Sequence, residues 1–247
     1  RMTNEKFDAL FGGPPRKPDQ WLTQREMDLA ASIQAVTEKV VLRLTRALAK
    51  ETGSKNLCLA GGVALNCVAN GKVLRAGNFD RIWIQPAAGD AGGALGAALL
   101  AYHLYRHQPR KLNGAIDGMQ GSYLGPDYAQ KGIEERLQKA GAKFTVMSER
   151  AVIETSAKAL AEGKALGWFQ GRMEFGPRAL GGRSILGDAR SPTMQKTMNL
   201  KVKYRESFRP FAPAVRREDV ADWFEIDSDS PYMLFVADVV KARRRTM

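Results

Sequence analysis

The chain has 247 residues, of which 44% are hydrophobic and 26% charged, and its formal net charge is +12. This length predicts one or two domains, and the composition excludes a disordered or fibrous protein. The longest apolar stretch is well short of the roughly 20 residues that span a bilayer, and the 2 cysteines are too few for a disulfide framework. We therefore expect a cytoplasmic protein without membrane contact.

The first part of the chain predicts alternating helices and strands. A long amphipathic helix is expected over residues 23–50, because apolar residues recur there at spacings of three and four. Thr23 and Glu26 form a capping-box pattern at its start, and Gly53 follows its end. Further helices and strands are expected, in alternation, at residues 56–60, 64–75, 81–85 and 91–105. The alternation predicts an α/β fold with a parallel or mixed sheet covered by helices on both faces.

A linker is predicted at residues 108–126, which lack periodicity and are rich in Gly, Pro, Asn and Asp. It would separate a first domain at residues 1–107 from a second at 127–247. The helices expected in the second domain cover residues 128–140, 150–162 and 218–224. The strands expected there cover residues 143–147, 165–170, 208–215 and 232–239.

Two turns of small residues follow the predicted strands of the first domain. In one turn, Gly61 and Gly62 precede Asn66 between a strand and a helix, where the backbone can closely approach an anion or a nucleotide. A tight turn alone would need the same glycines. In the other turn, Asp90 starts a glycine-rich helix, where an aspartate either caps the helix or ligates a metal. For the first turn, ligand contact and a purely structural turn stay open. For the second, helix capping and metal ligation stay open.

The positive charge is concentrated between Arg172 and Arg217, where eleven Lys and Arg residues stand against three acidic ones. The arginines are interleaved with Gly and Pro, which holds guanidinium groups on turns where they can bind phosphate or carboxylate oxygens. Ser184 lacks the glycine pattern of a nucleophile elbow and a neighbouring histidine, so serine hydrolysis is not expected. With 8% aromatic residues and no basic helical stripe, the segment favours a small anionic ligand over nucleic acid.

Two long motifs carry a resemblance to a known family. The first joins residues 58–66 (CLAGGVALN) with 86–92 (PAAGDAG), and the second joins 171–180 (GRMEFGPRAL) with 208–213 (FRPFAP). Together they resemble the O-carbamoyltransferases of nodulation-protein and antibiotic-biosynthesis type, which include tobramycin and cephem carbamoyltransferases. The similarity extends over nearly the whole chain.

The resemblance implies a fold and a reaction. It implies the C-terminal half of an actin-like ATPase (Kae1-like) domain at 1–107, followed by part of a YrdC-like α/β domain at 127–247. The chain would be the central piece of a longer enzyme and inactive alone. The whole enzyme would form carbamoyl-adenylate from carbamoyl phosphate and ATP, and transfer the carbamoyl group to a hydroxyl of a small-molecule acceptor. The alternative is an RNA-binding or tRNA-modification accessory module, similar to threonylcarbamoylation proteins, and the oligomeric state stays open.

The resemblance also assigns roles to residues of the motifs. Catalytic residues that grip carbamoyl phosphate would be Arg178, Lys203 and Arg209, with substrate-binding neighbours at Arg172, Arg183, Ser184 and Arg205. The wall of the ATP site would include Gly61, Gly62 and Asn66. Asp90 would ligate a divalent metal, iron, together with histidines from an upstream segment that this chain lacks; His103 and His107 do not match their position. We expect the basic side chains to share one pocket for a compact phosphorylated donor.

Overall fold

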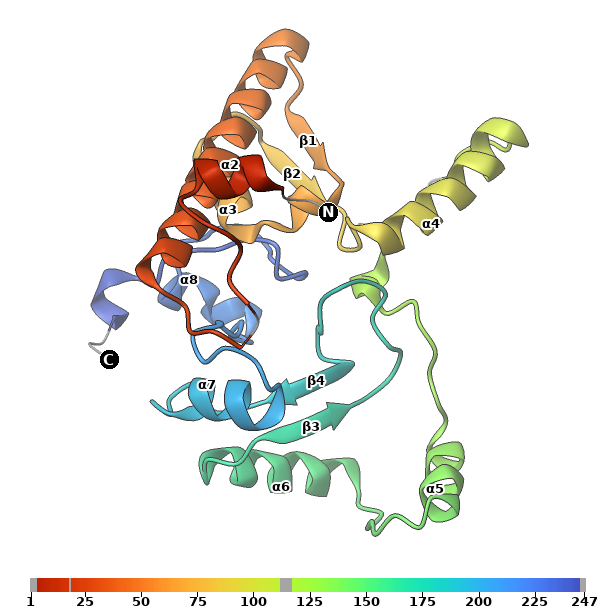
Figure 1. The fold of residues 1–247 in the computed structure, drawn as a ribbon. Helices are drawn as coiled ribbons and strands as arrows, with labels where there is room; N and C mark the ends of the chain where they lie inside the picture. The colour runs from red at the N-terminus through yellow and green to blue at the C-terminus, as the bar shows by residue number, and fades with distance from the viewer. Residues whose placement is uncertain (1–3, 18, 112–116, 245–247) are drawn as a thin grey trace. The chain divides into compact units, whose positions relative to one another are not determined.

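The structure is a computed structural model that describes residues 4–17, 19–111 and 117–244 (Figure 1). The chain divides into two compact units. The first unit consists of Arg1–Leu57 and Val68–Ile82, and the second consists of Cys58–Cys67 and Trp83–Met247. The second unit therefore takes in the first glycine turn and the whole basic segment.

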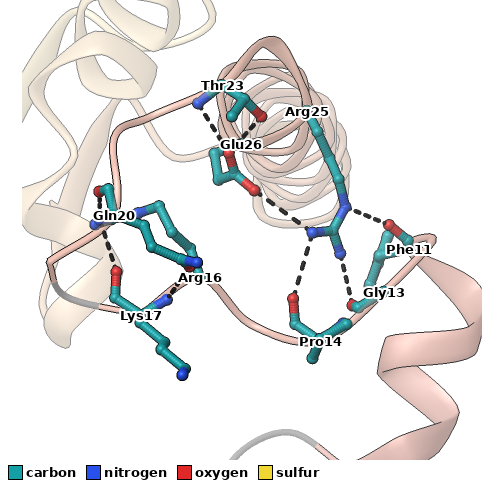
Figure 2. A network of polar contacts seen from close by, with 9 residues as sticks. All are labelled: Phe11, Gly13, Pro14, Arg16, Lys17, Gln20, Thr23, Arg25 and Glu26. Atoms are coloured by element: carbon teal, nitrogen blue, oxygen red, sulfur yellow. Dashed lines mark hydrogen bonds and ion pairs between the residues drawn. The ribbon is translucent and has the colours of Figure 1, made fainter.

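The first unit is dominated by the long helix that the sequence predicts. A short helix α1 (Glu5–Leu10) precedes α2, which covers Gln24–Thr52. Figure 2 shows how α2 begins: the Glu26 carboxylate accepts hydrogen bonds from the backbone N–H and the hydroxyl of Thr23, at 2.9 and 2.6 Å. In the same network, the Arg25 guanidinium donates to the carbonyl oxygens of Phe11, Gly13 and Pro14, which ties the preceding loop to the helix. The helix ends at Gly53 in the left-handed conformation, so the predicted caps are confirmed.

The strands β1 (Asn56–Leu59) and β2 (Arg81–Ile84) form a two-stranded sheet. The carbonyl oxygen of Lys55 accepts a hydrogen bond from Asp80 N–H at 2.8 Å, and that of Leu59 accepts one from Gln85 N–H at 3.0 Å. Residue numbers therefore increase in the same direction along both strands, as in a parallel pair. The elements that follow these strands are the 3-10 turn η1 (Gly62–Leu65), helix α3 (Cys67–Arg75), and helix α4 (Asp90–Leu100), continued by the π-helical turn η2 (Ala101–Tyr105). These elements confirm the predicted alternation.

The sheet predicted for the first part of the chain is present as the β1–β2 pair. A second, separate sheet pairs β3 (Leu166–Phe169) with β4 (Arg183–Leu186) in antiparallel register, from Leu166 opposite Leu186 to Phe169 opposite Arg183. Helix α6 (Glu149–Ala161) contacts β3 (Figure 1). No residue of α4 is buried. The sequence showed alternation, but not which strands pair.

Three other predicted strands are not formed. Residues 143–147 have no strand structure, and 208–215 contain Pro210 and Pro213, which lack the N–H that a ladder requires. Residues 232–239 contribute only an isolated bridge between Phe224 and Val239. An extended segment becomes a strand only when a neighbour satisfies its backbone groups, and sequence periodicity does not supply that neighbour.

The remaining helices include predicted and unpredicted ones. Predicted are α5 (Gln130–Lys139), α6, and the pair η5 (Arg217–Asp219) and α8 (Val220–Trp223). Not predicted are η3 (Gln120–Ser122), α7 (Met194–Thr197), η4 (Met198–Val202) and η6 (Lys241–Arg243). None of the helices in residues 4–17, 19–111 and 117–244 combines the length and apolar character needed to cross a membrane.

Residues 117–126, at the end of the predicted linker, form hydrogen bonds with the basic segment of the second unit. Gly125 N–H donates to the Met173 carbonyl oxygen at 2.9 Å, and Phe175 N–H donates to that of Ser122 at 2.7 Å. The hydroxyl of Tyr123 donates to the carbonyl oxygen of Leu180. This stretch therefore supports the loop that carries the second family motif. Residues 112–116 lie outside the described chain.

Candidate functional site

The loop that joins β3 to β4, residues 170–182, folds around one acidic side chain. Glu174 is 8% exposed, and its Oε1 accepts hydrogen bonds from the backbone N–H groups of Leu180 and Gly182, each at 2.7 Å, and of Arg183 at 3.3 Å. Burial by itself raises the pKa of Glu174, but these backbone donors outweigh it and hold the pKa below its ordinary value. The carboxylate therefore stays ionised and anchors the turn that leads into β4.

A shallow hollow lies beside the β3–β4 pair. We call it the hairpin hollow, and it has a volume of about 340 Å3. It is lined by Gly167, Trp168, Phe169, Ala179, Arg183, Ser184, Ile185 and Lys203. The structure thus brings together three of the residues that the sequence assigned to the donor site: Arg183, Ser184 and Lys203.

Two of these residues bring positive charge to the hairpin hollow. Within the described residues, neither Arg183 nor Lys203 forms an ion pair with a carboxylate. The Arg183 guanidinium lies 3.3 Å from the centre of the Phe169 ring and donates to the carbonyl oxygens of Gln170 and Gly171, at 3.0 and 3.2 Å. Carbonyl oxygens and an aromatic face orient the guanidinium but leave its net charge in place. A ligand in the hollow would therefore meet positive charge that the protein itself has not neutralised.

Arg178 points to a different part of the second unit. Its Nη2 donates to the carbonyl oxygen of Leu65, at 3.2 Å, at the end of the first glycine turn. Its Nε is buried without a hydrogen-bond partner among the residues that the structure describes. Close by, a Cβ on Gly176 would lie 3.3 Å from the Pro86 carbonyl oxygen, so the two family motifs are in contact here. Arg178 therefore links the second motif to the first.

The second basic stretch, residues 199–211, is organised by a buried amide. Asn199 is fully buried, and its Nδ2 donates to the carbonyl oxygens of Ser207 and Arg209, at 3.1 and 2.8 Å. Its Oδ1 accepts from Nε of Arg205 at 2.6 Å, and the Arg205 guanidinium also lies 4.9 Å from the centre of the Phe211 ring. The side chain of Arg209 is exposed and pairs with Glu206 at 2.8 Å.

The predicted basic residues do not all share one pocket, contrary to our expectation. Arg172 donates to the Gly125 carbonyl oxygen at 3.0 Å and lies 3.8 Å from an oxygen of Asp127. Arg178, Arg205 and Arg209 are likewise engaged with other parts of the chain. Arginine side chains bind carbonyl and carboxylate oxygens of their own protein as readily as those of a ligand, so residue type alone did not distinguish the two uses.

The residues assigned to ATP lie in an exposed turn. Gly61 and Gly62 are exposed, and Gly61 has a φ of 92°, a conformation that favours glycine. A Cβ on either glycine would meet no atom within 4 Å, so a ligand could approach the backbone closely. Asn66 is half-buried at the end of the turn, and its backbone N–H donates to Val63 at 2.9 Å. This geometry fits a nucleotide contact and equally a structural turn.

The metal assignment finds no complete ligand set in the described residues. Asp90 is exposed in the first turn of α4 and does not cap the helix through its side chain. No group of three or more His, Cys, Asp or Glu side chains in the described ranges is placed to hold a metal ion. His103 instead has its Nδ1 2.8 Å from the carbonyl oxygen of Gln108. The residues present thus do not form a metal site, and we derive no chemical step through one.

Glu174 and Asn199 are the residues that sequence reasoning missed. Both lie inside the basic segment, where they are polar residues of a type seldom fully buried. The signal that could have identified Glu174 is its position as the single acid in the motif GRMEFGPRAL. No comparable signal marks Asn199, because its role depends on carbonyl groups eight and ten residues further on.

The arrangement is an α/β fold with a shallow, open hollow whose lining includes Arg183 and Lys203. Comparison with known families identifies the class: the model "Carbamoyltransferase N-terminus" matches residues 1–99, and the model "Carbamoyltransferase C-terminus" matches residues 157–247. Together the two matches cover most of the chain. The chain belongs to the carbamoyltransferase family, as its motifs predicted, and this is a family of enzymes.

Relatives from several organisms agree with this assignment. An uncharacterized protein of Synechocystis is 61% identical over 240 residues, covering 96% of this chain and 39% of the relative. Nodulation protein NolNO of Sinorhizobium fredii is 43% identical over 237 residues, covering 94% and 34%. The 3'-hydroxymethylcephem-O-carbamoyltransferase of Streptomyces clavuligerus is 35% identical over 179 residues, covering 72% and 32%. The chain thus spans only about a third to two fifths of the length of these relatives.

Proposed function

We propose that this chain is part of an ATP-dependent O-carbamoyltransferase. The complete enzyme would form carbamoyl-adenylate from carbamoyl phosphate and ATP and transfer the carbamoyl group to a hydroxyl of a small-molecule acceptor. The Streptomyces relative is named as an O-carbamoyltransferase, which supports a hydroxyl acceptor. The actin-like and YrdC-like identities of the two domains, and the status of the chain as a central fragment, belong to the same proposal.

The observation that carries the proposal is the pair of cations on the hairpin hollow. Arg183 and Lys203 line the hollow and have no carboxylate partner in the described residues, whereas Arg209 and Arg190 are paired with Glu206 and Asp188. A phosphate group would supply the missing negative charge, and Ser184 adds a hydroxyl that can donate a hydrogen bond. The same fixed cations would stabilise charge that develops when phosphate leaves.

Isothermal titration of the chain with carbamoyl phosphate tests this assignment. Lys203→Ala should weaken binding about tenfold or more, because a hydrogen bond between charged groups contributes roughly 1.5–3 kcal/mol. Lys201→Ala is the matched control, since Lys201 is exposed two residues away and does not line the hollow. Its affinity should stay within about twofold of the wild type, well below the tenfold step that 1.4 kcal/mol produces. Absence of binding to the wild type, or equal losses in both variants, would refute the proposed donor site.

A further inference from the structure

The second unit contains an unusual feature, a buried negative charge. Among residues 4–17, 19–111 and 117–244, Glu174 is the only buried carboxylate. Removing a charge from water is unfavourable unless hydrogen bonds or an opposite charge compensate it. No ion pair to Glu174 is present in that part of the chain. The compensation comes from the backbone of the chain itself.

The backbone donors all belong to the turn that starts β4. Leu180, Gly182 and Arg183 direct their N–H groups at one oxygen of Glu174. Without this acceptor, the three N–H groups would have to bind water, or the turn would have to change its conformation, because buried N–H groups are rarely left unpaired. The carboxylate therefore determines where the polypeptide enters β4.

The packing around the turn leaves little freedom for any other arrangement. A Cβ on Gly182 would lie 2.6 Å from the Arg172 carbonyl oxygen and 3.1 Å from Oε2 of Glu174. Only glycine fits between the carboxylate and the opposite side of the loop. The Gly181 N–H donates to the Ser184 hydroxyl oxygen at 3.0 Å, which extends the ordered turn by one more residue.

The residues that follow this turn are the ones that line the hairpin hollow. Arg183 receives its backbone position from Glu174 directly, and Ser184 is the next residue along β4. The Arg183 side chain then reaches back to Gln170 and Gly171 and lies over Phe169. Glu174 is absent from the lining of the hollow, yet its carboxylate holds the backbone N–H of Arg183 at the Arg183–Ser184 edge.

We propose that Glu174 is a positioning residue for the ligand site: it holds the turn at residues 180–183 so that Arg183 and Ser184 face the hairpin hollow. The proposal deepens the proposed function, because it explains how the cationic edge of the donor site is fixed. The effect of Glu174 on the turn concerns this chain alone and does not depend on whether carbamoyl phosphate is the donor. The variant Glu174→Gln keeps the shape of the side chain but removes the charge, which roughly halves the strength of each hydrogen bond.

Nuclear magnetic resonance of the full chain tests the positioning directly. In Glu174→Gln, hydrogen exchange of the Leu180, Gly182 and Arg183 amides should be about tenfold faster, the factor that 1.4 kcal/mol produces. The Arg183 Nε–H resonance should also lose the shift that the Phe169 ring imposes on it, because the guanidinium would leave the ring. Glu162→Gln is the matched control: Glu162 is an exposed acid of the same unit that pairs with Lys164. It should change neither signal.

The outcomes separate the two proposals. A folded Glu174→Gln variant with unchanged exchange and an unchanged Arg183 signal would overturn the positioning role.

Where the wild type binds carbamoyl phosphate, Glu174→Gln should weaken that binding about tenfold at a temperature where both proteins are folded. Unchanged affinity despite a displaced Arg183 side chain would also overturn the positioning role of Glu174. A wild type that does not bind refutes only the donor assignment, and the Arg183 signal still decides the inference. If Glu174→Gln does not fold, Glu174→Asp, which keeps the charge but shortens the side chain, is judged by the same two signals.

Discussion

The two basic stretches of the second unit are organised by opposite chemistry. In residues 170–186 the backbone presents N–H donors, and a buried carboxylate, Glu174, accepts them. In residues 199–211 the backbone presents carbonyl oxygens, and a buried amide, Asn199, donates to them. In both stretches a buried polar side chain satisfies backbone groups that no strand or helix would satisfy. The type of that side chain must match what the surrounding loop offers.

The comparison also shows how the fold divides its positive charge. Arg172 and Arg178 of the first stretch donate to carbonyl oxygens of distant residues and so hold the loop in place. In the second stretch Arg205 binds the amide of Asn199, and Arg209 binds a neighbouring acid. Only Arg183 and Lys203, one from each stretch, line the hairpin hollow. The number of cations that line the hollow is thus much smaller than the number counted along the sequence.

Asn199→Asp should break the second stretch and have the largest effect on stability. The substitution replaces the Nδ2 donor by an oxygen that faces the carbonyl oxygens of Ser207 and Arg209 in a fully buried site. Two lost hydrogen bonds and the repulsion between the new carboxylate and the two carbonyl oxygens, partly offset by the neighbouring Arg205 guanidinium, predict a decrease of about 2–3 kcal/mol in the free energy of unfolding. Urea denaturation followed by circular dichroism measures it, and a change below about 0.5 kcal/mol, the usual range for surface substitutions, would contradict the role of Asn199.

Arg178→Ala should lower the stability of the fold more than it lowers the affinity for the donor, because Arg178 connects the two motifs. Loss of the hydrogen bond to the Leu65 carbonyl oxygen predicts a decrease of about 1–1.5 kcal/mol in the free energy of unfolding. The same variant should weaken carbamoyl phosphate binding less than Lys203→Ala does, since Arg178 does not line the hollow. An affinity loss larger than that of Lys203→Ala, with stability unchanged, would instead assign Arg178 to the donor.

The pH dependence of stability should distinguish the charged side chain of Glu174 from the neutral side chain of Asn199. The pKa of folded Glu174 lies below its ordinary value of 4.5, so below pH 4.5 the unfolded chain binds more protons than the folded one. The stabilisation by Glu174 is therefore complete above that pH and is lost as the pH falls through the folded pKa. The Arg190 side chain likewise lowers the pKa of Asp188 to about 2, which adds to the acid sensitivity.

Urea titrations of the wild type and Glu174→Gln between pH 6 and pH 3, values that bracket the ordinary carboxyl pKa of about 4, isolate the contribution of Glu174. The wild type should lose stability more steeply than the variant as the pH falls, because only the wild type retains that carboxylate. The contribution of Asp188 remains in both proteins and cancels in the comparison. Parallel pH profiles would show that Glu174 is not held ionised by the turn.

Arg209→Ala should have the smallest effect. Both members of the Arg209–Glu206 pair are about half exposed, and exposed ion pairs contribute only about 0–1 kcal/mol. We expect a decrease below about 0.5 kcal/mol in the free energy of unfolding and no change in carbamoyl phosphate affinity. A tenfold loss of affinity in titration calorimetry would restore Arg209 to the donor site that the sequence predicted.

Prediction from the sequence succeeded where the deciding interactions are local. The capping box of Thr23 and Glu26 and the glycine cap at Gly53 involve residues three or four positions apart, and the predicted ends of α2 were confirmed within two residues. Prediction failed for the strand at 208–215, where the two prolines were a visible warning. It also missed β4, because the partner that makes Arg183–Leu186 a strand lies across a loop in β3.

The sequence indicates members of the candidate site better than their arrangement. It assigns Arg183, Ser184 and Lys203 to the donor site, and these three line one hollow. It assigns Arg178 and Arg209 to the same site, but their side chains contact other parts of the chain. The resemblance of motifs identified the family because it depends on residue identity and order, and neither requires knowledge of a side chain's contacts.

Residue order and local spacing suffice to identify the family, the long helix with its caps, and the segment in which the positive charge is concentrated. Which cations bind distant parts of the chain and which line the hollow depends on the folded arrangement. A guanidinium binds carbonyl or carboxylate oxygens wherever the fold supplies them, and those oxygens come from residues as far away as Leu65 is from Arg178. The buried anchors Glu174 and Asn199 depend on the same kind of contact, which exists only once the loops have folded.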